Sequence, residues 1–92
     1  QYETAQEFRL YNAFPNPFNP ATKILYTLRK KEHVALTIYD LLGREITTLV
    51  NEEQAAGLHE VTWNAGAYAS GIYFYRIQTG RFSDVKKMVL IK

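Results

Sequence analysis

Apolar and polar residues alternate along most of this chain, which is the pattern of β-strands that bury one face. The alternation is clearest in residues 70–78, where aromatic and β-branched side chains are dense. Period-two spacing puts Tyr73, Tyr75 and Ile77 on one face of this strand. Gly80 then breaks the pattern, and residues 81–92 return as a second strand. We therefore predict a hairpin over the last third of the chain.

The same alternation recurs in four earlier segments, residues 23–28, 34–39, 45–50 and 58–63. Polar and glycine-containing stretches separate these segments, as expected for turns. No segment shows a sustained 3.6-residue period, so the pattern does not favour amphipathic helices. Strands at roughly ten-residue spacing with turn signals between them are typical of a sandwich. The predicted fold class is all-β, an immunoglobulin-like antiparallel β-sandwich of about seven strands.

The alternation also predicts which side chains fill the space between the two sheets. We expect the following residues to be mostly buried: Ile24, Leu36, Ile38, Val61, Trp63 and Tyr73. The turn between the second and third of these strands should use Asp40, whose carboxylate can accept backbone N–H groups, and Gly43, which tolerates a left-handed conformation.

The start of the chain is polar and weakly periodic, so we predict a linker or lead-in over residues 1–9 and one domain over residues 10–92. Residues 13–20 contain three prolines, which lock φ and donate no hydrogen bond. This excludes a helix or a central strand there, and favours an edge segment that protects a sheet from further pairing. The alternative is a proline-rich ligand for an aromatic groove.

Composition narrows the classes of function. A length of 92 residues suits one domain, and a net charge of +2 is too small to indicate nucleic-acid binding. The absence of cysteine excludes disulfides and thiolate metal sites. No apolar run approaches the ~20 residues that span a bilayer, so we predict no transmembrane segment. Because Gln1 is not an initiator and no signal peptide precedes it, we expect a piece of a longer protein.

The sequence offers little for catalysis. His33 stands beside a charged turn, His59 lies within a predicted strand, and Ser70 and Ser83 lie in or next to turns. No nucleophile elbow, phosphate loop or zinc-protease motif occurs. Asp40 lacks the oxygen-rich spacing of a calcium loop, and the adjacent acidic pair at 52–53 is expected to face water. We therefore predict a protein that is not an enzyme and carries no cofactor and no metal.

Two surface features remain open. The seven tyrosines and Trp63 could form a sugar-stacking platform, although the alternation of Tyr26, Trp63, Tyr73 and Tyr75 with polar residues favours the core for these four. The pair at 86–87, Lys86 and Lys87, could be a basic docking point or ordinary solvated lysines that guard an edge strand.

An ordered series of short motifs resembles a known family. The opening stretch, residues 16–24, reads Asn-Pro-Phe-Asn-Pro-Ala-Thr-Lys-Ile, and the series continues through residues 38–40 with Gly43 and Arg44. It then runs through Leu49, Val50, Gly57, His59, Val61, Trp63 and residues 70–73, and ends with residues 87–92. Together these resemble the type A C-terminal sorting domains of the type IX secretion system. The pattern is also similar to the immunoglobulin-like domain of flagellar hook-assembly proteins.

The resemblance implies a seven-stranded sandwich at the C-terminus of a secreted cargo protein, with an upstream cargo domain in the same chain. It implies recognition by an outer-membrane translocon, passage through the periplasm and outer membrane, and a final location that is secreted or on the cell surface. It also implies removal by a sortase-like peptidase, after which cargo is released or anchored to surface lipopolysaccharide. Carried over to this chain, the sorting residues are Gly71, Tyr73, Lys87, Met88, Val89, Leu90, Ile91 and Lys92.

The last strand is apolar on both faces, with Met88 and Leu90 on one and Val89 and Ile91 on the other. One face can pack on the sandwich, and we expect the other face, or the strand's unpaired edge, to be available to a receptor by β-addition. Two other roles stay open, a carbohydrate-binding module and a structural accessory module of a secreted multidomain enzyme.

Overall fold

The computed structural model describes residues 7–92, which form seven β-strands and no helix. The strands are β1 (Arg9–Leu10), β2 (Ala21–Leu28), β3 (Glu32–Asp40), β4 (Glu45–Gln54), β5 (Gly57–Asn64), β6 (Gly71–Gln78) and β7 (Ser83–Leu90). Within residues 7–92, no helix has the length and apolarity needed to cross a lipid bilayer. The predicted all-β class is confirmed.

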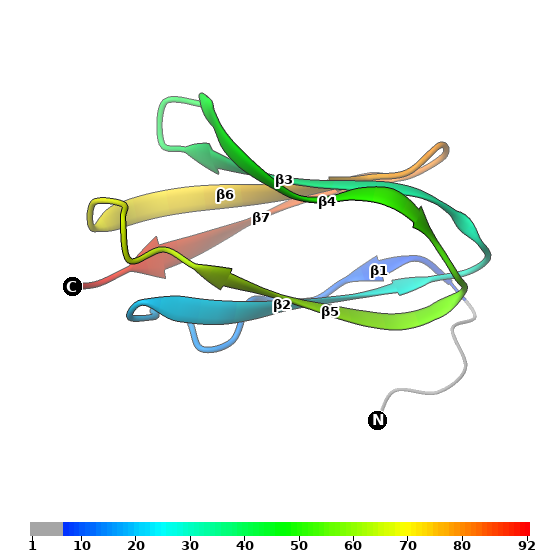
Figure 1. Ribbon diagram of the computed structural model, residues 1–92, viewed down its shortest axis with the longest axis horizontal. Helices are drawn as coiled ribbons and strands as arrows, with labels where there is room; N and C mark the ends of the chain where they lie inside the picture. The colour runs from blue at the N-terminus through cyan, green and yellow to red at the C-terminus, as the bar shows by residue number, and fades with distance from the viewer. Residues whose placement is uncertain (1–6) are drawn as a thin grey trace.

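Two antiparallel sheets lie face to face (Figure 1). One sheet has the order β1-β2-β5 and the other has the order β4-β3-β6-β7. The predicted terminal hairpin is β6–β7, in which Gly71 pairs with Leu90 and Gln78 pairs with Ser83. The sandwich of seven strands is therefore also confirmed, with β7 at one edge of the larger sheet.

The core between the sheets is built from the inward residues of each alternating strand. In β6 these are Tyr73, Tyr75 and Ile77, as the period-two pattern predicts, and all are buried. Most of the residues expected in the core are buried as well: Ile24, Leu36, Ile38, Trp63 and Tyr73. Val61 is only partly buried against the same core, because β5 is the edge strand of the smaller sheet.

The described part of the predicted lead-in is packed on the sandwich. The Thr27 hydroxyl donates a hydrogen bond to the Glu7 carbonyl oxygen at 3.0 Å, and Arg9 pairs with Thr27 in the sheet. The ring of Phe8 stacks on the ring of Phe82, with centroids 5.3 Å apart. The described residues 7–9 of the predicted lead-in therefore contact the domain, and residues 1–6 of the predicted linker lie outside the described residues.

The proline-containing stretch runs along sheet edges, as predicted. Phe14 exchanges two backbone hydrogen bonds of 3.0 Å with Lys23 of β2. The chain then crosses to the other sheet, where Phe18 forms a parallel bridge with Leu90 of β7. One short segment thus covers the edge of a central strand in one sheet and the edge of the last strand in the other.

The β3–β4 turn is closed by Asp40, as the sequence predicts. Asp40 Oδ1 accepts the backbone N–H groups of Leu42 and Arg44, each at 2.9 Å, and Oδ2 accepts Arg44 Nε at 2.8 Å. Gly43 has φ +85°, a conformation that favours glycine. The backbone N–H of Arg44 is the main reason why the pKa of the Asp40 carboxyl lies below its ordinary value.

This turn should make stability depend on acid pH. A carboxyl whose pKa is lowered on folding stabilises the folded state above its ordinary pKa and loses that contribution as the pH falls through the lowered value. We expect the melting temperature of the wild type to fall between about pH 5 and about pH 2 more steeply than that of Asp40→Asn, whose amide keeps an acceptor oxygen but no charge. Equal pH slopes in thermal melts would contradict this role of Asp40.

Candidate functional site: the last strand and its surroundings

The residues proposed for sorting lie together at one end of the sandwich. β7 finishes at the same end of the sandwich as the β3–β4 turn and the loop between β5 and β6 (Figure 1). Met88 and Leu90 point inward and are 0% and 1% exposed, whereas Ile91 is 51% exposed and Val89 is half-buried. The two faces predicted for the last strand are confirmed, and the core takes Met88 and Leu90.

Gly71 and Tyr73 shape the entry to β6. Gly71 has φ +152°, which L side chains rarely adopt, so this position favours glycine. The Tyr73 hydroxyl donates a hydrogen bond to the carbonyl oxygen of Ala69 at 2.6 Å. Because the Tyr73 ring is buried, this bond ties the preceding loop to the core. Both residues hold the backbone against which the end of β7 pairs.

An aromatic cluster fills the core beneath this end. Trp63, 3% exposed, is its centre. Three rings have centroids close to that of Trp63: Phe18 at 5.8 Å, Tyr68 at 5.6 Å and Tyr73 at 5.4 Å, the last in an edge-on arrangement. The proline-containing segment, β5 and β6 therefore meet in one packed group directly under β7.

The outer edge of β7 is occupied, which corrects the expectation of an unpaired edge. Asn16 Nδ2 donates to the Lys87 carbonyl oxygen at 3.3 Å, and Asn16 Oδ1 accepts the Val89 N–H at 3.0 Å. Phe18 N donates to the Val89 carbonyl oxygen and Phe18 O accepts the Ile91 N–H, both at 2.9 Å. We call Asn16 and Phe18 with these four hydrogen bonds the edge clamp.

The sequence did not predict the edge clamp, because one of its partners is a side chain and not a strand. A side-chain amide carries both a donor and an acceptor, so Asn16 can imitate the backbone of a neighbouring strand. The sequence showed an asparagine before a proline, which by itself indicates only a turn. Its partners lie 71 and 73 residues further along the chain, and local pattern does not identify them.

The chain's last residues are also tied to neighbouring loops. Lys92 Nζ donates to the Gly66 carbonyl oxygen at 2.7 Å. The Ala65 N–H donates to the Pro20 carbonyl oxygen at 2.8 Å.

Lys87 is exposed, and within residues 7–92 its amine takes part in none of the ion pairs. Of the two candidate docking lysines, Lys87 is thus the more accessible, and Lys86 is half-buried.

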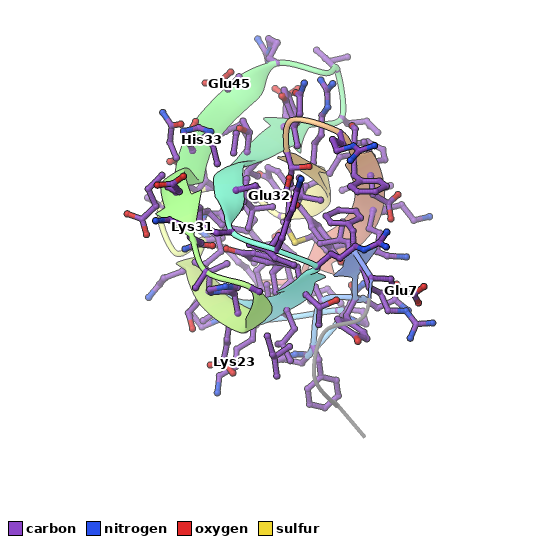
Figure 2. The ribbon with its side chains drawn as sticks, turned by 90° about the vertical axis from the view of Figure 1, so that its right-hand side faces the viewer. Glu7, Lys23, Lys31, Glu32, His33 and Glu45 are labelled. Atoms are coloured by element: carbon purple, nitrogen blue, oxygen red, sulfur yellow. The ribbon has the colours of Figure 1, made fainter. Side chains whose placement is uncertain are left out.

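The structure does not bring the candidate catalytic groups together. His59 Nε2 lies 2.7 Å from the Ala55 carbonyl oxygen, and its ring stacks on Tyr26 with centroids 5.4 Å apart. His33 is exposed, and its side chain lies on the outside of the sandwich (Figure 2). Ser70 immediately precedes β6, whereas the Ser83 hydroxyl accepts a hydrogen bond from Arg76 Nε at 3.3 Å.

The positions of the acidic, histidine and aromatic side chains bear on the hypotheses of a metal site and a sugar site. Over the described part of the chain, no group of three or more His, Cys, Asp or Glu side chains could hold a metal ion. Four of the aromatic residues considered for a sugar platform, those expected in the core, are buried: Tyr26, Trp63, Tyr73 and Tyr75. A sugar ring cannot stack on them, so the platform hypothesis for these residues is wrong.

Comparison with known proteins agrees with the fold and the motifs. The dimeric latent PorU from Porphyromonas gingivalis is similar in structure with a TM-score of 0.71 at 19% identity, over 89% of this chain and 9% of that one. PorZ of the same organism, an essential bacterial surface component of the type IX secretion system, has a TM-score of 0.63 at 25% identity, over 90% and 11%. This chain thus spans about a tenth of either protein.

No curated protein sequence matches the chain. The family model of the secretion system C-terminal sorting domain, however, matches residues 12–92, which is nearly the whole chain and includes every motif from Asn16 to the last strand. The chain therefore belongs to this family, the C-terminal sorting domains of the type IX secretion system.

Proposed function

We propose that this domain delivers an upstream cargo through the periplasm to the outer-membrane translocon of the type IX system, and that a sortase-like peptidase then removes it. Family membership carries the proposal. The arrangement of the chain supports it, because β1 enters at the end of the sandwich opposite to the end where β7 finishes (Figure 1). A cargo joined upstream would leave the end of β7 accessible.

We assign the sorting role to residues 10–92 as one unit, with Gly71, Tyr73 and residues 87–92 at its centre. Gly71 and Tyr73 act by positioning, since one sets the backbone and the other anchors the loop before β6. Residues 87–92 present the signal itself. The domain acts by binding and not by catalysis, which agrees with the exposure of His33 and with the contact of His59 with the Ala55 carbonyl oxygen.

A secretion assay tests the sorting role. We expect a reporter fused upstream of the domain to reach the cell surface or medium of a host with a type IX system, and deletion of residues 89–92 to leave it in the periplasm. The deletion removes Val89, the buried Leu90 and the hydrogen bonds of Val89 and Ile91 to the edge clamp. A thermal melt of the truncated domain therefore has to show that it is folded before a loss of secretion is assigned to recognition. The matched control, Leu58→Thr, changes an exposed side chain of β5 in the other sheet and should be secreted normally.

A structural spacer would behave differently in the same assay. If the fusion lacking residues 89–92 reached the surface at the level of the full-length fusion, the sorting role of β7 would be refuted and the spacer role would replace it. Immunoblotting of periplasmic, surface and medium fractions gives the distribution directly.

A further inference from the structure

The last strand leaves only part of its surface accessible to a receptor. Its inward side chains, Met88 and Leu90, are buried in the core. Its backbone edge is paired with Asn16 and Phe18 in the edge clamp along residues 87–91. Further back along the strand, the Val85 N–H donates to Asp84 Oδ1 at 2.8 Å, which occupies another edge donor. The side chains that point outward from β7 are what remains.

The edge clamp is firmly held in place. The Phe18 side chain is 2% exposed and packs on Trp63. A receptor that added a strand to the edge of β7 would have to displace the Phe18 backbone and draw this ring out of the core. It would also have to replace all four hydrogen bonds of the clamp. Exposing a buried aromatic ring and breaking these hydrogen bonds both cost free energy. The backbone edge of β7 is therefore not accessible to a receptor.

The outward side chains of β6 and β7 form a continuous surface. In the antiparallel register, Ile72 lies opposite Val89 and Phe74 lies opposite Lys87, so each pair shares the outer side of the sheet. Ile91 follows Val89 on the same face. We call Ile72, Phe74, Lys87, Val89 and Ile91 the outer β6–β7 face.

A hollow adjoins this face at the β3–β4 turn. It has a volume of ≈ 310 Å³, and its lining includes Leu41, Leu42, Gly71 and Ile72. Leu41 and Leu42 are 62% and 76% exposed. Three of the large apolar side chains that are exposed among residues 7–92 lie at this end of the sandwich: Leu41, Leu42 and Ile91. Such clustering marks an interaction surface more than scattered exposure does.

We propose that the type IX machinery reads the outer β6–β7 face through its side chains and does not add a strand to the edge of β7. The inference rests on the sorting role proposed above. The partner is a protein receptor whose apolar side chains cover Ile72, Val89 and Ile91 and enter the hollow beside Leu41. An acidic group of the receptor faces Lys87, whose amine is exposed and forms none of the ion pairs within residues 7–92.

The test replaces the apolar part of the face without changing strand propensity. Threonine is β-branched and suits strands, so Ile72→Thr, Val89→Thr and Ile91→Thr together should leave the domain folded. We expect the secreted fraction of the fused reporter to fall at least roughly tenfold, as when central contacts of an interface are lost. Lys87→Glu alone should also lower it. Thermal melts of the purified domains verify that each variant is folded.

Two controls make the result specific. Leu58→Thr changes an apolar side chain of similar exposure, 43%, on β5 of the other sheet, and should be secreted like the wild type. Asn16→Ala opens part of the β7 edge and should also be secreted like the wild type. If Asn16→Ala raised secretion severalfold, or if the folded triple variant were secreted normally, the outer β6–β7 face would not be the element that is read.

The two experiments fail in different ways. If deletion of residues 89–92 left secretion intact, the sorting role of β7 itself would be refuted. If that deletion blocked secretion while the folded triple variant was secreted normally, the sorting role would stand and only the reading of the outer β6–β7 face would be refuted.

Discussion

Replacement of Trp63 by alanine is expected to destabilise the domain by about 3–5 kcal/mol, the usual range for removal of a core aromatic side chain. Trp63 is 3% exposed, and the rings of Phe18, Tyr68 and Tyr73 pack around it. The variant leaves a cavity where three segments of the chain meet, and these segments cannot close on it without moving β5, β6 or the edge clamp. Reversible unfolding in denaturant, compared with the wild type, gives the difference in free energy.

A matched control uses an exposed aromatic residue of the same chain. Phe14 is 78% exposed, so Phe14→Ala should change the free energy of unfolding by only about 0.5 kcal/mol or less. Trp63→Phe, which keeps a ring in the cluster, should lie between the two. A loss below about 1 kcal/mol for Trp63→Ala would contradict the packing described for this cluster.

The two sheets could be predicted because burial follows the period-two pattern so closely in this chain. In β6, Tyr73, Tyr75 and Ile77 are buried, and their alternating neighbours are more exposed. The same reasoning overestimated the burial of Val61, because the pattern shows which face is inward but not which strand lies at an edge. Edge position depends on the order of strands in the sheet, which arises from contacts between distant segments.

The candidate site could be predicted only in part for the same reason. The apolar character of both faces of β7 was visible, but its edge contacts were not, because the partners of Lys87 and Val89 are the side chain of Asn16 and the backbone of Phe18. The prolines of that segment indicated edge protection, and the structure confirms it. The sequence does not show which edge is protected, because this depends on how the segment crosses from β2 to β7 in the folded structure.

The difference in burial between the two faces of β7 decides which variants can separate recognition from stability. Met88 and Leu90 are 0% and 1% exposed, so polar residues at these positions would bury unpaired hydroxyl groups and create cavities. Any loss of secretion in such variants would reflect unfolding. Val89 and Ile91 on the other face can be changed while the core stays intact.

An increase from about pH 10 to about pH 12 is expected to unfold or strongly destabilise the domain, because two tyrosines are buried with their hydroxyl groups protonated. Tyr26 and Tyr75 are 1% and 0% exposed, and burial raises the pKa of each to about 12 from the ordinary value of 10.0. The Tyr26 hydroxyl donates to Gln54 Oε1, and the Tyr75 hydroxyl donates to the Tyr11 carbonyl oxygen at 2.8 Å. For both phenols, burial is the largest cause of the raised pKa.

The sign follows from linkage. A group whose pKa is raised on folding contributes its full stabilisation below its unfolded pKa and loses it as the pH rises through the folded value. Each tyrosine should lose on the order of 2 kcal/mol by the upper end of this range. Denaturant unfolding at a series of pH values, with tyrosinate absorbance followed in parallel, measures both changes. The double variant Tyr26→Phe with Tyr75→Phe should start less stable but decline less between the same pH values. If the wild type and the double variant declined in parallel, the two phenols would not be the groups that make the fold sensitive to alkali.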